Sequence, residues 1–281
     1  MTRKQYWSMN ECVFDCLIDE KRTRAFQKAI MATVRPGDVV VDAGAGSGIL
    51  AFFAADAGAS RVYAIERDPI HHENMKANIR RNGYENQITL LQGDAVHLQL
   101  PEPVDVIICE MIATGLIAEL QVPVMNNLIK YGKTGVRVVL AKFHSFVDLV
   151  SIDERFYGQR LKIIRHEYPD MDTLTASPLS DKKMFLAVDL SQPIRKTLLK
   201  IHTTLRVNGG SESVINGLRI SSLTVFYDGS ILDGTYAYSY PLILPLEDIH
   251  VNGNEEFNVD FSYRLCGGLR TLVYGVSPVS Q

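Results

Sequence analysis

The sequence predicts an α/β protein in two parts: a doubly wound parallel sheet with helices on its faces, followed by an antiparallel β sandwich or barrel. Two observations carry this prediction. In the first half, β-rich apolar runs alternate with segments of helical periodicity, and a glycine-rich turn, residues 44–48, follows the first such run. Past about Ser145, short β-rich runs are separated by turns instead. We therefore expect domains over 1–145 and 146–281.

The first domain is expected to begin with one or two helices, because apolar residues recur at helical spacing over 13–34. Each later strand is a β-rich run bounded by turn residues, and each helix is a stretch of helical periodicity between two such runs. The expected strands cover residues 39–43, 61–66, 88–91, 103–110 and 135–141, and the expected helices cover 49–57, 69–81 and 116–128.

The second domain has β-rich runs at 184–188, 200–207 and 223–227. Turn-forming residues lie between the runs, at Asn208-Gly209-Gly210, Asp228-Gly229 and Asn252-Gly253-Asn254. Such turns between β-rich segments are hairpin signals. The pattern therefore favours an antiparallel β domain.

Composition narrows the classes of protein without excluding a nucleic-acid partner. The net charge of −3, from 29 Lys plus Arg against 32 Asp plus Glu, gives no overall basic surface for a phosphate backbone. Four scattered cysteines lack the spacing of a disulfide framework or a metal site, and the chain shows no signal peptide or membrane span. We expect a cytoplasmic protein with reduced thiols, no membrane association and no bound metal.

Acidic residues stand at or near the ends of four expected strands: Asp42, Glu66, Asp94 and Glu110. Ligands of doubly wound sheets bind outside the carboxyl ends of the strands, and glycines let backbone N–H groups approach a ligand. The pattern predicts a nucleotide-type cofactor site. The alternative is a glycine-rich strand-to-helix turn without function.

Two cofactors suit such a turn, dinucleotides and S-adenosylmethionine. Glycines alternate at 44, 46 and 48, and Ile49 follows, so the G-x-G-x-x-G dinucleotide fingerprint is not met. Glu66 would accept hydrogen bonds from the ribose hydroxyls of either cofactor, so it does not discriminate between them. Asp94 provides a second carboxylate, which could meet an adenine amino group. Taken alone, Asp94 is more simply a turn aspartate. Together the sites favour S-adenosylmethionine.

Four matches make the chain resemble the protein arginine methyltransferase family. They are residues 17–23 followed by Ala29-Ile30, the run from Asp42 to Leu50 with the helix behind it, Glu66 at the ribose-binding position, and the stretch from Cys109-Glu110-Met111 to Ala118-Glu119. The last match is similar to the family's double-glutamate loop, with two carboxylates separated by eight residues. The first match implies that Arg22 meets the methionine carboxylate of the cofactor.

The resemblance implies a full set of site residues. Glu110 and Glu119 would be catalytic, and S-adenosylmethionine, with S-adenosylhomocysteine as product, would be held by Arg22, Asp42, Gly44, Gly46, Gly48, Glu66, Arg67, Asp94, Ala95 and Glu110. The chemistry is sound without the family, because paired carboxylates hold a guanidinium in bidentate geometry and align one nitrogen. For an isolated Glu119, however, an exposed helix glutamate is the simpler interpretation.

The chain departs from the family in its second half. The Thr-His-Trp triplet usual there has Tyr238-Ser239-Tyr240 as its expected counterpart, and the loop between the glutamates lacks Trp-Met-Gly. No clear helical dimerisation arm is found, since the polar stretch 153–183 is either a shortened arm or loop and strand. The oligomeric state is left open.

Three functions remain in view. The first is methylation of arginine in a protein substrate, the second methylation of RNA or a small molecule by the same fold, and the third a non-catalytic binding protein. Intact Arg22, Gly44, Gly46, Glu66 and Glu110 argue against the third. His71-His72 is interpreted as a solvated helix end, and Cys12 and Cys16 as core residues.

Overall fold

The computed structural model describes residues 10–168, 175–208, 212–234 and 239–279. Its helices are α1 (Asn10–Ile18), α2 (Glu20–Thr33), α3 (Ile49–Asp56), α4 (Pro69–Asn82) and α5 (Gln121–Leu128), with short 3-10 turns η1 (Thr114–Leu116), η2 (Ile129–Tyr131) and η4 (Leu269–Thr271). The strands of the first half are β1 (Val39–Ala43), β2 (Arg61–Glu66), β3 (Ile88–Gln92), β4 (Val104–Cys109) and β5 (Gly132–Val138).

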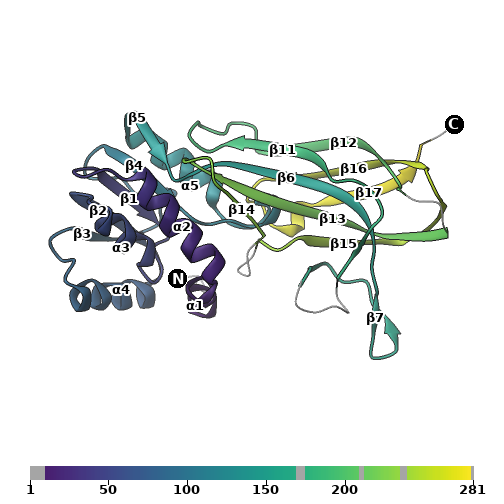
Figure 1. Cartoon of the computed structure of the whole chain (residues 1–281), viewed down its shortest axis with the longest axis horizontal. Coiled ribbons are helices and arrows are strands. Elements are labelled where there is room, and N and C mark those ends of the chain that lie inside the picture. Colours follow the sequence, from purple (N-terminus) through teal and green to yellow (C-terminus); the bar gives the residue numbers. More distant parts are fainter. Residues whose placement is uncertain (1–9, 169–174, 209–211, 235–238, 280–281) are drawn as a thin grey trace, which may run out of the picture.

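The first half is the predicted doubly wound unit. Its five-stranded sheet has the order β3-β2-β1-β4-β5, with parallel pairing throughout. All of β1 is buried, and so is β2 after Arg61, because helices cover both faces of such a sheet. Figure 1 shows α2 and α4 on the outside of this layer. Asp19 and Asp68 begin α2 and α4 as side-chain N-caps.

Two expected elements of the first half are wrong in extent. The helix expected over 116–128 is shorter than predicted: a 3-10 turn ends at Leu116, and α5 covers only Gln121–Leu128. Left-handed backbone at Gly115 and Leu116 interrupts the periodic pattern, and Pro123 is tolerated because it lies in the first turn of α5. The fifth strand ends at Val138, and Leu140 already belongs to the next sheet.

The second half is built from antiparallel strands. They are β6 (Leu140–Ser151), β7 (Arg155–Phe156), β8 (Gln159–Arg160), β9 (Arg165–His166), β10 (Ser177–Pro178), β11 (Lys183–Asp189), β12 (Leu198–Arg206), β13 (Glu212–Phe226), β14 (Ile231–Asp233), β15 (Leu242–Asn252), β16 (Glu256–Arg264) and β17 (Val273–Pro278). The seven-stranded sheet has β6 and β13 at its centre, and the three-stranded sheet has the order β12-β16-β17.

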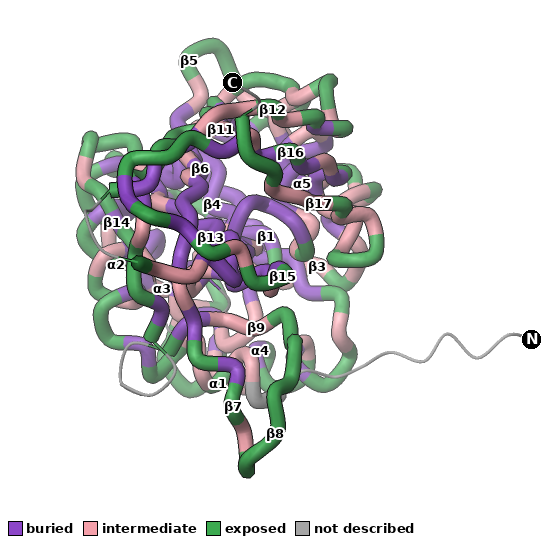
Figure 2. Tube along the Cα trace, turned by 90° about the vertical axis from the view of Figure 1, so that its right-hand side faces the viewer, coloured by how far each residue is buried: buried purple, intermediate pink, exposed green. Residues whose placement is uncertain are grey.

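These two sheets pack face to face, as Phe185 of β11 meets Phe261 of β16 edge-on at 4.8 Å between ring centroids. Within the described strands neither sheet closes on itself, so the arrangement is a sandwich and not the barrel that was the other expectation. In Figure 1 both sheets extend away from the parallel sheet, and in Figure 2 buried strands fill the middle of the end view.

Of the three predicted hairpin turns, one is confirmed and one is wrong. Asp228-Gly229 joins β13 to β14 in an antiparallel pair, as predicted. The turn at Asn252-Gly253-Asn254 is not a hairpin, because β15 pairs with β13 and β9 whereas β16 pairs with β12 and β17. The chain crosses from one layer to the other at that turn. Part of Asn208-Gly209-Gly210 lies outside the described residues.

The polar stretch 153–183 forms loop and short strands over its described residues, with β7 and β8 paired as a hairpin. In Figure 1 this hairpin projects away from the sandwich. The change from parallel to antiparallel sheet falls at Val139, which lies between β5 and β6. No helix of the described residues is long and apolar enough to cross a membrane.

Candidate active site

The glycine turn after β1 is built around the carboxylate of Glu66 at the end of β2. Gly46 N donates to Glu66 Oε2 at 2.9 Å, and Asp68 N donates to Glu66 Oε1 at 2.7 Å. Gly44, Gly46 and Gly48 all have positive φ, which favours glycine. Gly48 is the N-cap of α3. The turn therefore presents backbone at the carboxyl edge of the sheet, as the sequence predicts.

A cavity of about 160 Å³ lies against this turn. Its walls include five of the ten predicted cofactor residues, Gly44, Glu66, Arg67, Asp94 and Ala95, together with the predicted catalytic residue Glu119. Asp94 closes its own turn by accepting from Val96 N at 3.0 Å. The structural interpretation of Asp94 as a turn aspartate is thus correct, and the residue also faces the cavity.

Asp42, two residues before Gly44, is fully buried, and its Oδ2 has no hydrogen-bond partner in the described chain. Burial, reinforced by the negative charge of Glu66, raises the pKa of Asp42 to about 7. A buried carboxyl oxygen without a partner is costly, so it is a natural place for a ligand to bind.

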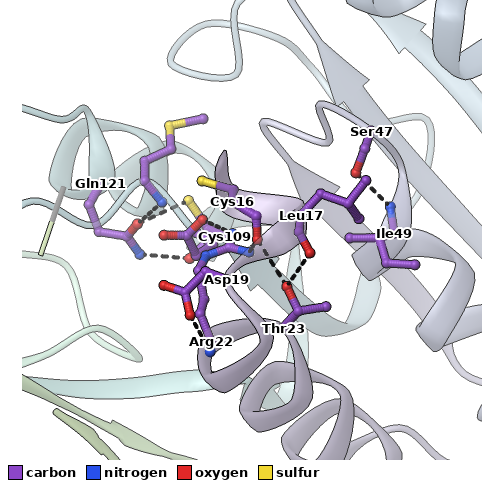
Figure 3. A network of polar contacts seen from close by, with 11 residues as sticks. Cys16, Leu17, Asp19, Arg22, Thr23, Ser47, Ile49, Cys109 and Gln121 are labelled. Carbon is purple, nitrogen blue, oxygen red and sulfur yellow. Dashed lines mark hydrogen bonds and ion pairs between the residues drawn. The ribbon is translucent and has the colours of Figure 1, made fainter. Parts of the chain in front are cut away.

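Arg22 and Glu110 form a buried ion pair between α2 and the end of β4. Arg22 Nη1 also donates to the carbonyl of Cys16 at 3.0 Å, while its Nε has no partner. Burial alone would lower the pKa of Arg22, but the Glu110 carboxylate outweighs it, so the pKa is raised. Figure 3 shows Arg22 and Cys16 meeting near Cys109.

Glu119 lies on the cavity wall, nine residues after Glu110. Burial raises the pKa of Glu119, and the negative charge of Glu110 raises it further. The charge of Glu110 therefore acts on Glu119, although Glu110 lines a separate, narrower pocket with Arg22. Between them, Met111 covers Gly44: a Cβ added to that glycine would lie 2.6 Å from the Met111 methyl group.

Sequence reasoning missed Gln121, a fully buried side chain at the start of α5. Its Nε2 donates to Cys109 O at 3.0 Å, and its Oε1 accepts from Met111 N at 2.9 Å. The amide thus holds the backbone on both sides of Glu110 (Figure 3). The only sequence signal is a glutamine inside an apolar run, which is too weak to single it out.

The expected counterpart of the Thr-His-Trp triplet is only partly described, since Tyr238 lies outside the described residues. The carbonyl of Tyr240 accepts from Thr114 Oγ1 at 2.6 Å and lies 2.9 Å from His166 Nδ1. Residues 238–240 contain no histidine, as the sequence shows, but His166 of β9 approaches this region. Sequence reasoning missed His166 because it lies 74 residues from Tyr240 in the chain.

The remaining candidates are the histidines and the cysteines. His71 is buried at the start of α4, against the expectation of a solvated helix end, and the described residues hold no metal-binding cluster. Cys12 and Cys16 are half-buried rather than core residues. A hydrogen bond with Cys12, together with burial, raises the pKa of the Cys16 thiol.

The residues present suit S-adenosylmethionine. Unpartnered buried groups, Arg22 Nε and Asp42 Oδ2, are available to a ligand carboxylate and to a ligand donor respectively. Gly44 has no side chain to fill the cavity, and Asp94 also lines it. Arg22 lies in the narrow pocket beside Glu110, however, and not on the wall of the larger cavity.

The fold and this edge define a class I methyltransferase, and comparison with known proteins agrees. Residues 21–147 match the model of the ribosomal protein L11 methyltransferase (PrmA) family. A solved structure, the Trypanosoma brucei PRMT1 enzyme–prozyme heterotetrameric complex with AdoHcy, shares the fold with a TM-score of 0.75 over 94% of this chain and 96% of that one, at 17% identity.

Sequence relatives place the chain further. An uncharacterized protein of Methanocaldococcus jannaschii is 33% identical over 92% of this chain and 94% of its own length. The protein arginine N-methyltransferase 2 of Dictyostelium discoideum is 30% identical over 59% of this chain, which spans only 32% of that protein. The chain belongs to the family of the archaeal protein, a family of class I methyltransferases similar to the protein arginine methyltransferases. Its cofactor is S-adenosylmethionine.

Proposed function

We propose that the protein transfers a methyl group from S-adenosylmethionine to a guanidinium nitrogen of an arginine side chain in a protein substrate. The observation that carries this proposal is the pair Glu110 and Glu119 at the two ends of one buried loop. Their charges interact, and Glu110 already has a guanidinium, that of Arg22, as its partner. A guanidinium stays charged at ordinary pH and is best held by carboxylates.

Each residue has a role in this proposal. Bound S-adenosylmethionine supplies an electrophilic methyl group on a sulfonium. Arg22 and Asp42 hold the polar end of the cofactor, and Glu66, Asp94 and the glycine turn hold the nucleoside end. Glu110 and Glu119 bind the acceptor and orient one nitrogen, so positioning and charge pairing provide most of the catalysis.

The acceptor is the part of the proposal that needs an experiment. We would incubate the protein with S-adenosylmethionine labelled in its methyl group and with a glycine-rich peptide containing one arginine. Methylarginine in the acid hydrolysate is the expected product. A peptide with lysine in place of arginine is the control for a general protein amine methyltransferase. Label found only in RNA, in a small molecule or on lysine would overturn the arginine proposal.

The same assay tests the two carboxylates. Glu110→Gln keeps the shape of the side chain but removes its charge, so we expect methyl transfer to fall at least a hundredfold. Cofactor affinity, measured by calorimetry with S-adenosylhomocysteine, should stay within about fivefold, because Glu110 acts on the acceptor. Glu73→Gln, at an exposed position of α4, is the matched control. Full activity of Glu110→Gln would remove the acceptor role.

A further inference from the structure

The loop that joins Glu110 to Glu119 has an unfavourable backbone conformation. Residues 112–117 are all buried, and two neighbours, Gly115 and Leu116, have φ of 67° and 53°. Leucine disfavours this left-handed region because of its Cβ, so the conformation persists only where the surroundings hold it. The loop contacts that do so come largely from the antiparallel half of the molecule.

Two buried side chains bind the main chain of Gly115. Gly115 N donates to Ser222 Oγ of β13 at 2.9 Å, and the Tyr263 hydroxyl of β16 donates to Gly115 O at 2.7 Å. Ser222 Oγ also lies 3.0 Å from Ser145 Oγ of β6. Both hydrogen-bonding groups of one loop residue are therefore satisfied by side chains from distant parts of the sequence.

The segment that follows β16 continues the contact. Cys266 N donates to Leu116 O at 2.7 Å, and Gly268 N donates to Ile117 O at 2.8 Å. Residues 115–117 of the loop are thus hydrogen-bonded one after another to Tyr263 and to the turn behind it. The approach also depends on glycine, because a Cβ at Gly115 would lie 3.3 Å from the Tyr263 oxygen.

The Tyr263 hydroxyl is chemically suited to this contact. The side chain is fully buried and stacks on Phe261 at 6.4 Å between ring centroids, a role that phenylalanine would fill equally well. A buried hydroxyl needs a partner, and this one has the Gly115 carbonyl. Burial raises the pKa of Tyr263, so the hydroxyl remains a donor.

We infer that Tyr263 and Ser222 are positioning residues for methyl transfer: they hold the loop so that Glu110 and Glu119 are correctly placed for the acceptor. This inference rests on the proposed function of the two glutamates. Of the two pockets of the site, Tyr263 lines neither, and Ser222 lines only the narrow one beside Glu110 and Arg22, not the cavity at the glycine turn. Loosening their contacts should therefore disturb the acceptor carboxylates and leave cofactor binding intact.

The test compares Tyr263→Phe and Ser222→Ala with the wild-type protein. We expect kcat with the arginine peptide to fall by roughly ten- to a hundredfold, because catalysis is sensitive to displacements of about 1 Å. The affinity for S-adenosylhomocysteine should stay within about twofold. Hydrogen exchange of the amides of residues 112–117 should become faster, since the variants remove their holding contacts.

Tyr274→Phe is the matched control. Tyr274 lies in β17, beside β16, and its hydroxyl donates to the Pro245 carbonyl at 3.1 Å, so the same atom is removed from the same sheet. It should leave kcat and loop exchange unchanged. If the role of Tyr263 were merely structural, Tyr263→Phe and Tyr274→Phe would lower thermal stability alike. In that case kcat per folded molecule would stay unaltered in both.

Two failures can be told apart. If the wild-type protein methylates no arginine, the proposed function fails, but the exchange measurement needs no acceptor and still tests the inference. If Tyr263→Phe and Ser222→Ala leave loop exchange unchanged, or if Tyr274→Phe accelerates it equally, the inference is overturned whatever the acceptor is.

Discussion

The two sides of the site are built in different ways. The cofactor side is local: Asp42, the glycine turn and Glu66 lie within 25 consecutive residues, at the ends of two neighbouring strands. The acceptor side is assembled from distant segments, because the loop after Glu110 is held by side chains that follow it by more than a hundred residues. The cofactor side is therefore one continuous sequence motif, whereas the acceptor side forms only when the two halves of the molecule pack together.

This difference teaches where each kind of change will act. Substitutions at Asp42, the glycine turn and Glu66 should alter cofactor affinity, whereas substitutions in the loop from Glu110 to Glu119, or in the sandwich residues that hold it, should alter turnover. Arg22 and Gln121 lie where the two sides meet, and they test how separable the sides are.

Arg22→Ala should have the largest effect of the substitutions considered for cofactor binding. It removes the guanidinium that suits the cofactor carboxylate and leaves the buried Glu110 without its partner. Removing one member of the buried pair should lower the free energy of unfolding by about 3 kcal/mol. A hydrogen bond to a charged group contributes about 1.5–3 kcal/mol, so losing the guanidinium should also lower the affinity for S-adenosylhomocysteine roughly ten- to a hundredfold. Calorimetry measures it, and Arg24→Ala, exposed on the same helix, should bind like the wild type. An unchanged affinity in Arg22→Ala would assign that arginine to Glu110 alone.

Gln121→Met should affect the acceptor side and stability together. It leaves Cys109 O and Met111 N buried without their partner, which should lower the free energy of unfolding by about 2 kcal/mol. Urea denaturation measures this loss, and kcat should fall because Glu110 lies between the two freed groups. The control is Gln87→Met, whose amide makes one long contact of 3.4 Å to Ala59 O. Equal losses in both variants would contradict a specific role for Gln121.

How far the sequence predicts the molecule follows the same division. The parallel sheet of the first half, its glycine turn, and the positions of Glu66 and Asp94 at strand ends are predicted because hydrophobic period and turn chemistry are local signals. Ser222, Tyr263 and Gln121 are not predicted. No local pattern singles them out, because the partner of each side chain is fixed only when segments distant in the sequence come together.

The wrong predictions have the same origin. The helix expected from residue 116 has good periodicity, but the loop contacts hold Gly115 and Leu116 in a left-handed conformation that local pattern does not encode. The hairpin expected at Asn252-Gly253-Asn254 has good turn chemistry, yet the turn joins two layers. Turn residues indicate that the chain reverses, and tertiary packing decides which strand it meets.

Glu66→Gln sharpens the cofactor side. The carboxylate accepts from Gly46 N and Asp68 N, and it lines the cavity. An amide keeps one acceptor and loses the charge, so the affinity for S-adenosylhomocysteine should fall about tenfold, or about 1.4 kcal/mol. Fluorescence or calorimetric titration measures it, against Glu102→Gln at the opposite end of the sheet as control. kcat at saturating cofactor should change little, and a large loss of kcat alone would contradict the division between the two sides.

The smallest effect expected is a pH dependence from Asp42. Burial raises the pKa of Asp42 to about 7 in the folded protein, while the unfolded value is 3.8. Between these values the folded state holds a proton on Asp42 that the unfolded state releases, so the contribution of Asp42 to stability is largest at low pH and falls as pH rises toward 7. From pH 6 to 7 the contribution of Asp42 should fall by about 1 kcal/mol. Urea denaturation at both pH values should show this fall in the wild-type protein, and Asp42→Asn, which cannot ionise, should lose that part of it. If both proteins show the same pH dependence, Asp42 is already ionised in the fold, and its unpartnered oxygen must be paired with a cation or a donor before any cofactor binds.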